Sequence, residues 1–406
     1  MAFAISACPI MEDATAAANS VGYAREASSG GVIAENDSPT QGGQQPLRHT
    51  ESGSRPVAAT PRVPRFDDLP HRVVNRAAVG QFVGWCGTRG RYMIWDPPEN
   101  VWLLDLASDN AEKSVASGAS RQCDEAGENV TFLDTKQSAL VKLNFSLNAK
   151  DIMLRYRQIG TRTPTLSVSP DLKSVAYDAS TVSLEQPATA DIRAIPLSGD
   201  NGQRVGAIRW KADLSSLFYI VEDRSSRVES MRIMDINKGE TSAIRLPSGF
   251  EFWDGGFLDG DRGFLLFMRR PLSAEGPRPG TVFVCAGGSA GCRPVLGSVD
   301  EFSMNERGYF GAVTLSYRDP RVRYASDSFV FPDKYVVRIM NADGFPIIRQ
   351  EFPGRLTTAM KVHVSPSNGL LINWETVCQM ANSICWSIEV VEFSDNPGSS
   401  THRKRH

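Results

Sequence analysis

The stretch VSPDLKSVAYD, Val168 to Asp178, contains a pattern that recurs along the chain. An apolar residue, Val168, is followed by a turn of Ser, Pro and Asp, and an apolar strand resumes seven positions later at Val175. Ser, Pro and Asp favour turns because each one restricts the backbone or hydrogen-bonds to it. The stretch therefore predicts a tight connection between two antiparallel strands.

The same seven-residue step recurs at intervals of roughly forty residues, with short apolar runs such as SLFYIV and GFLLFM between the copies. Seven pairs of positions show it: Trp85 and Tyr92, Phe132 and Ala139, Val168 and Val175, Trp210 and Leu217, Leu258 and Leu265, Phe302 and Tyr309, and Val364 and Leu371. No long stretch has the period of an amphipathic helix. A repeat of this length that contains only strands is typical of a blade. The sequence thus predicts an all-β chain, a β-propeller of four-stranded blades with seven blades, preceded by a disordered N-terminal segment.

Together with strands such as RIMNADG, Arg338 to Gly344, the stretch VSPDLKSVAYD resembles the repeats of TolB-type, WD40-like (PD40) β-propellers. The resemblance covers roughly residues 75 to 395 and extends to the propeller domain of prolyl-oligopeptidase-like peptidases, without their hydrolase domain. One departure is Leu172, which stands where the family usually has glycine. The resemblance implies a closed propeller and says little about function.

Composition changes along the chain and predicts its organisation. Residues 1–70 are rich in small and polar residues and are predicted to be a disordered tether, 71–396 the propeller, and 397–406 a flexible basic tail. The net charge of −2 gives no electrostatic footprint for nucleic acid, so no nucleic-acid partner is expected. No run of eighteen apolar residues occurs, so no membrane-spanning helix is expected.

Seven cysteines occur, and two pairs have the same spacing. Cys285 and Cys292, like Cys378 and Cys385, are seven positions apart, which places them opposite each other in a hairpin with a two-residue loop. Opposed Cα atoms lie roughly 4.5–5.5 Å apart, within the range of a disulfide. We predict both pairs to be disulfides, with Cys86–Cys123 as a third bond. Buried free thiols remain the alternative, whereas a zinc site lacks enough closely spaced Cys and His ligands.

Cys8 is left over, and its context suggests a lipid anchor. ISAC, Ile5 to Cys8, has the order of a bacterial lipobox, although the seven preceding residues contain no Lys or Arg. We predict lipid attachment at Cys8 if translation begins upstream; otherwise the match is chance. The expected location is the cell envelope, periplasmic or anchored in the outer membrane through that lipid only. A cytoplasmic protein with free thiols is the alternative.

Three patterns that could suggest chemistry have simpler explanations. GGSAG, Gly287 to Gly291, matches a nucleophile elbow but is predicted to be a hairpin loop, because no helix pattern follows it. DGGFLDGDRG, Asp254 to Gly263, is predicted to be a turn rather than a calcium loop. No cofactor and no metal are expected. The tryptophans are predicted to pack between blades: Trp85, Trp95, Trp102, Trp210, Trp253, Trp374 and Trp386.

These observations favour a non-catalytic binding or scaffold β-propeller of the bacterial cell envelope. We expect it to engage a protein or glycan partner through its loops or funnel face. The alternative is a secreted propeller enzyme, a lyase or hydrolase acting on glycans, with an acidic site at the axis. Whether the chain is an enzyme is uncertain from sequence, because axial residues of a propeller come from remote positions.

Overall fold

A computed structural model shows the arrangement of the strands. It describes residues 63, 65, 69, 71–74, 81–87, 91–96, 100–105, 111–115, 119–124, 126–161, 164–187, 192–199, 203–222, 229–260, 262–271, 279–286, 291–317, 332–354, 359–366, 369–377 and 384–392. These residues form seven β-sheets, which we call blades 1 to 7 in chain order. Within this described part no helix is long and apolar enough to cross a bilayer.

Four blades consist of four consecutive antiparallel strands each. Blade 1 contains β2 (Gln81–Cys86), β3 (Arg91–Asp96), β4 (Asn100–Asp105) and β5 (Ala111–Val115). Blade 4 contains β14 (Arg204–Trp210), β15 (Ser216–Glu222), β16 (Glu229–Asp235) and β17 (Thr241–Arg245). Blade 5 contains β18 (Glu251–Phe257), β19 (Phe264–Arg269), β20 (Gly280–Cys285) and β21 (Cys292–Val299). Blade 6 contains β22 (Glu301–Met304), β23 (Tyr309–Ser316), β24 (Lys334–Asn341) and β25 (Pro346–Pro353).

Blade 2 contains a strand that lies between two strands of blade 3 in the sequence. Blade 2 contains β6 (Ala119–Cys123), β7 (Asn129–Asp134), β8 (Ala139–Asn144), β9 (Ala149–Gln158) and, beyond β9, β12 (Val182–Pro187). Blade 3 therefore holds only β10 (Leu166–Val168), β11 (Ser174–Asp178) and β13 (Arg193–Leu197), and β13 pairs with β11 in parallel. The prediction of four strands in every blade is wrong for these two sheets.

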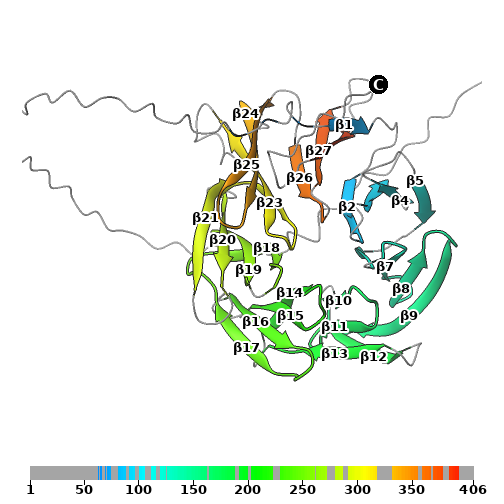
Figure 1. Cartoon of the computed structure of the whole chain (residues 1–406). Helices are drawn as coiled ribbons and strands as arrows, with labels where there is room; N and C mark the ends of the chain where they lie inside the picture. Colours follow the sequence, from blue (N-terminus) through cyan, green and yellow to red (C-terminus); the bar gives the residue numbers. More distant parts are fainter. Residues whose placement is uncertain are drawn as a thin grey trace, which may run out of the picture. The chain divides into compact units, whose positions relative to one another are not determined.

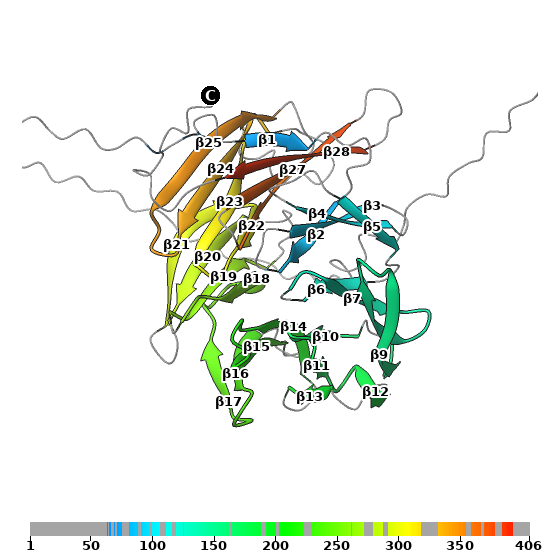
Figure 2. The same ribbon diagram turned by 45° about the vertical axis from the view of Figure 1, so that its right-hand side comes forward.

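The N-terminal strand completes the last blade. Blade 7 contains β26 (Ala359–Val364), β27 (Gly369–Val377) and β28 (Ile384–Glu392), and β1 (His71–Val74) pairs with β28 in antiparallel fashion. Figure 2 shows β1 lying alongside β28. Because this sheet combines both ends of the propeller sequence, its hydrogen bonds hold the ring of blades closed.

The first strand of each blade lies innermost, and these strands follow one another around a common axis (Figure 1). Contacts connect β2 with β6, β10 with β14, β14 with β18, β18 with β22, and β22 with β26. Gln122 of β6 donates its side-chain amide to the carbonyl of Val168 in β10 at 2.8 Å. The ring closes where Phe82 of β2 stacks on His363 of β26, with 3.9 Å between ring centroids.

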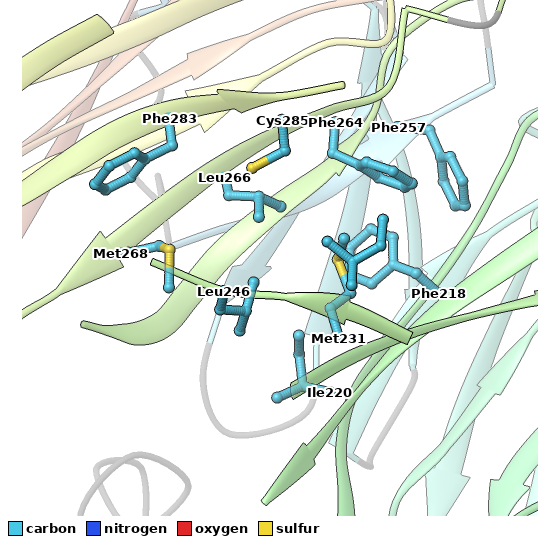
Figure 3. Close-up of a cluster of buried hydrophobic side chains, with 11 residues drawn as sticks. Phe218, Ile220, Met231, Leu246, Phe257, Phe264, Leu266, Met268, Phe283 and Cys285 are labelled. Atoms are coloured by element: carbon cyan, nitrogen blue, oxygen red, sulfur yellow. The ribbon is translucent and has the colours of Figure 1, made fainter. Parts of the chain in front are cut away.

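The core lies between blades because each blade packs face to face against the next. Strands β15 and β19 are buried on both faces, which explains why SLFYIV and FLLFM are continuous apolar runs rather than alternating ones. Figure 3 shows the cluster between blades 4 and 5, where Phe218 and Ile220 lie near Phe264 and Leu266. Burial of a side chain of this size stabilises the fold by about 1.5–3 kcal/mol.

The seven-residue step is the register of the hairpin between the first two strands in blades 1, 3 and 4, where Trp85 opposes Tyr92, Val168 opposes Val175 and Trp210 opposes Leu217. In blade 2 the predicted anchor was wrong, because Phe132 lies on the second strand and opposes Val141. The matching pair there is Cys123 and Val130. The predicted anchors of blades 5 to 7 are also displaced: the opposed pairs are Phe257–Phe264, Met304–Phe310 and Val364–Leu370.

Candidate functional site

The innermost strands of blades 5, 6 and 7 run in the same direction. A Cβ atom placed on Gly256, near the end of β18, would lie 3.4 Å from the sulfur of Met304 at the end of β22. Asn305, just after β22, donates its side-chain amide to the carbonyl of Ser365, just after β26, at 2.8 Å. We call the end where these strands begin the proximal end and the opposite one the distal end.

At the proximal end of blade 5 a β-bulge exposes an aromatic ring. In the pairing of β18 with β19, Phe252 opposes Met268 and Asp254 opposes Phe267, so Trp253 between them has no opposing residue. Trp253 is 52% exposed, whereas Phe252 packs against the core between blades 4 and 5. Bulges commonly re-aim a side chain in this way. The prediction that every tryptophan packs between blades is therefore wrong for Trp253.

Two neighbouring residues fix this bulge. Asp254 accepts hydrogen bonds from the amide of Gly255 at 2.8 Å and from Nη2 of Arg209, on β14, at 3.0 Å. Gly255 has a φ of +154°, and a Cβ atom there would lie 2.5 Å from the carbonyl oxygen of Leu265. Only glycine fits this approach, so the sequence Asp-Gly after Trp253 determines the local backbone.

A guanidinium group lies over the exposed ring. The Cζ of Arg269, the last residue of β19, lies 4.1 Å from the centroid of the Trp253 ring, and Nη2 donates to the backbone carbonyl of Asp300. Nε of Arg269 is buried and has no hydrogen-bond partner within the described residues. Burial lowers the pKa of Arg269, while the charges of Glu301 and Asp300 act in the opposite direction.

A carboxyl group next to this arginine is shielded from water. Burial raises the pKa of Glu301, the first residue of β22; Lys361 on β26 and Arg269 lower it, and Asp300 raises it further. Glu301 is therefore held toward its neutral form despite two nearby cations. The side chain of Asp300 accepts a hydrogen bond from the amide of Leu315 at 2.7 Å, which gives it a structural role.

Five residues from blades 5 to 7 thus form one group at the proximal end, which we call the proximal cluster: Trp253, Arg269, Asp300, Glu301 and Lys361. It combines a half-exposed aromatic ring, two cations and a carboxyl group that burial favours in the protonated form. Such a combination can bind a ring with polar substituents, because the ring stacks and the charged groups set its orientation.

The hollow at the distal end is too small for most ligands. A hollow of about 90 Å³ is lined by Lys211, Ala212, Asp213, Phe257, Leu258, Asp259, Gly260 and Glu306. Ligand pockets usually measure about 300–1,000 Å³, so this hollow has room for a few waters only. The pKa of Asp213 is lowered chiefly by the hydroxyl of Ser215, so its carboxylate is engaged within its own turn. Within the described part of the chain no cluster of His, Cys, Asp or Glu could hold a metal ion.

The structure contains two of the predicted disulfides. Cys86–Cys123 joins the innermost strands of blades 1 and 2, and Cys285–Cys292 joins opposed residues of β20 and β21, with Cα atoms 4.0 Å apart. Neither bond touches the proximal cluster in the described structure. Their positions between and within blades give them a stabilising role.

Other predicted features lie outside the described residues. This applies to Cys8 with its lipobox, to Cys378, and to the GGSAG loop up to residue 290. Cys385 belongs to β28, where Thr376 opposes it. The Cys378–Cys385 bond and the lipid at Cys8 stay predictions.

Sequence reasoning did not identify the proximal cluster as a site. Its residues lie on strands β18, β19, β22 and β26, or directly before β22, and no local motif joins them. The outermost two, Trp253 and Lys361, are 108 positions apart in the sequence. One signal was present. The string EFWDGGF breaks the alternation of a strand at Trp253 and follows it with Asp and two glycines, a pattern that fits a bulge.

Comparisons with known proteins concern the fold. No protein-family model matches the sequence, and no curated protein matches it. The β-propeller domain of Cps50 (Swd1) from Myceliophteria thermophila is similar in structure, with a TM-score of 0.50, 12% identity, and coverage of 80% of this chain and 100% of that domain. TolB from Acinetobacter baumannii has a TM-score of 0.40 and 15% identity, over 72% of this chain and 65% of that one.

An oligogalacturonate lyase from Vibrio parahaemolyticus is also among the similar structures, with a TM-score of 0.42 and 8% identity over 81% of this chain and 94% of that one. At such identities likeness speaks for the fold and not for activity. The seven sheets around one axis and the likeness to the Swd1 domain together identify this chain as a β-propeller.

Proposed function

We propose that this chain is a non-catalytic binding or scaffold propeller of the bacterial cell envelope, which engages a protein or glycan partner through its proximal end. The observation that carries this proposal is the exposed ring of Trp253, which a bulge turns out of the core and Arg269 covers on one face. Exposure forfeits part of the stabilisation that burial of an aromatic ring gives, and the contact with Arg269 offsets only some of it. Unlike Phe345, which is exposed on a turn, Trp253 belongs to a strand. Its exposure is understandable if a partner covers it.

The disulfides support the location. Cys86–Cys123 and Cys285–Cys292 are two bonds in a chain with a large apolar core, and such bonds persist in oxidising compartments such as the periplasm. A lipid on Cys8, followed by a flexible tether to about residue 70, would keep the propeller at the envelope while leaving its faces accessible.

Binding to envelope material tests the proposal. Purified protein is mixed with the insoluble envelope fraction of a Gram-negative bacterium and sedimented, and the bound fraction is measured. Trp253→Ala should lose most of its binding. Phe345→Ala is the matched control, because Phe345 is 67% exposed on the turn between β24 and β25 at the distal end. If both variants bind as the parent does, or both lose binding equally, the proximal end is not the binding surface.

A second candidate function, an enzyme acting on glycans, rests on Glu301. A carboxyl group whose pKa is raised by burial can hold a proton at higher pH than usual and donate it to a leaving oxygen. Incubation of the protein with polysaccharides, followed by detection of new reducing ends or unsaturated products, tests this candidate. Catalysis should disappear in Glu301→Gln; product formation that persists in this variant would exclude Glu301 as the acid.

A further inference from the structure

We propose that the proximal cluster is a binding site for an acidic saccharide: a sugar ring stacks on Trp253, and its carboxylate is bound by Arg269 and Lys361. This inference rests on the proposed function and adds the chemical class of the ligand.

The ring of Trp253 provides a half-exposed platform. Arg269 occupies one face at 4.1 Å, and half of the residue is exposed to solvent. The bulge, held by Asp254 and by the glycine requirement at Gly255, fixes the backbone that carries the ring. A fixed platform suits a pyranose ring, whose C–H groups stack on an aromatic face without an entropy cost for ordering the protein.

The charges favour an anion. Arg269 and Lys361 supply two positive charges next to Glu301. Of the two carboxyl groups nearby, Asp300 accepts the amide of Leu315 and keeps its negative charge, so the two cations outnumber the anions only when Glu301 is protonated. A carboxylate on the ligand would pair with the charges of Arg269 and Lys361, and charge-assisted hydrogen bonds are stronger than neutral ones.

Glu301 then decides how binding depends on pH. The groups that act on it electrostatically are Lys361 from β26, Arg269 from β19 and Asp300 from its own segment. A ligand carboxylate next to Glu301 would repel its ionised form and accept a hydrogen bond from its protonated form. Acidic saccharides should therefore bind more tightly as the pH falls, until the ligand's own carboxyl group becomes protonated below roughly pH 4.

The test uses a matched pair of ligands. Affinities of the full chain for a hexuronic acid trisaccharide and for its carboxyl-reduced, neutral counterpart are measured by isothermal titration calorimetry between pH 5 and pH 7.5. The acidic ligand should bind about tenfold or more tightly than the neutral one, since the carboxylate contributes at least one charge-assisted hydrogen bond. Affinity for the acidic ligand should increase toward pH 5.

Four variants assign the effect to residues. Lys361→Met should lose about tenfold affinity for the acidic ligand and little for the neutral one. Glu301→Gln should lose the dependence on pH, because a glutamine amide donates a hydrogen bond at every pH. Trp253→Ala should weaken both ligands. Thermal unfolding of each variant confirms that it is folded, and Trp253→Tyr should restore part of the binding.

The outcomes separate this inference from the function on which it rests. Equal affinity for acidic and neutral trisaccharides would overturn the acidic class and leave glycan binding in place. Binding of the acidic ligand that survives both Trp253→Ala and Lys361→Met would place the ligand elsewhere and overturn the site. If neither trisaccharide binds while Trp253→Ala still abolishes sedimentation with envelope material, the proposed function stands with a partner of another class and this inference falls.

Discussion

Stability at acid pH should depend on one histidine at the place where the ring of blades closes. His363 of β26 stacks on Phe82 of β2, with 3.9 Å between the ring centroids, and its Nε2 is buried without a hydrogen-bond partner in the described structure. Burial, with a smaller contribution from the positive charge of Lys361, lowers the pKa of His363 to about 3. The ring therefore remains neutral in the folded protein at any ordinary pH.

The sign of the pH effect follows from this depression. In the unfolded chain the pKa of a histidine is about 6.5, so below that pH the unfolded state binds a proton that the folded state does not bind. The contribution of neutral His363 to the free energy of unfolding is complete above pH 6.5. It is lost as the pH falls from there toward 3. With about 1.4 kcal/mol for each pH unit, the loss is about 2 kcal/mol at pH 5 and about 4 kcal/mol at pH 3.5.

The perturbation is His363→Phe, which keeps an aromatic ring against Phe82 and removes the titrating group. Urea unfolding of parent and variant is measured at several pH values from 7.5 to 4, and the difference in unfolding free energy is plotted against pH. Titration of all other groups cancels in this difference. The variant should gain about 2 kcal/mol on the parent between pH 7.5 and pH 5. A difference in unfolding free energy that does not change with pH would show that His363 can take up a proton in the folded protein without cost. This result would refute the assignment.

Three further predictions concern disulfides, backbone strain and the anchor. Removal of Cys86–Cys123, whose cysteines are 37 positions apart, should lower the free energy of unfolding by about 3.8 kcal/mol. Removal of Cys285–Cys292, whose cysteines are 7 positions apart, should lower it by about 2.4 kcal/mol, because a shorter loop restricts the unfolded chain less. Denaturant unfolding that gives the reverse order would contradict this prediction. Leu214→Gly should stabilise by about 0.5 kcal/mol, because Leu214 has a φ of +60° and glycine removes that strain at a smaller entropic cost. Leu172→Gly is the control, because Leu172 also has a positive φ, of +61°, but packs against the core. Thermal unfolding should therefore show no gain in stability for Leu172→Gly. An equal gain in stability at both sites would show that the packing of Leu172 contributes nothing. Cys8→Ser, expressed from its native locus, should move the protein from the membrane fraction to the soluble fraction. If the variant and the parent partition identically, the prediction of a lipid at Cys8 is wrong.

Local patterns determined much of the fold. Turn residues followed by an apolar strand, repeated along the chain, predicted an all-β propeller with seven blades, and seven sheets are present. The step from Val168 to Val175 is the register of a hairpin, because turn chemistry and strand alternation act between neighbouring residues. Two of the three predicted cysteine pairs, Cys86–Cys123 and Cys285–Cys292, are disulfides in the structure. They could be predicted because one pair has the spacing of opposed residues in a hairpin and the other lies on consecutive blades.

Tertiary structure decided what depends on contacts between blades. Blade 2 takes β12 from blade 3, and β1 joins β28, because strand edges pair with whichever edge the packing of the ring brings near. Phe132 was placed on the wrong strand for the same reason: which hairpin lies innermost is set by the axis and not by the hairpin. The proximal cluster shows this most clearly. Trp253, Arg269, Glu301 and Lys361 show no shared motif in the sequence. They come together because consecutive blades place the beginnings of β18, β22 and β26, and the end of β19, at the same end of the propeller, where burial and charge act across segments far apart in the chain.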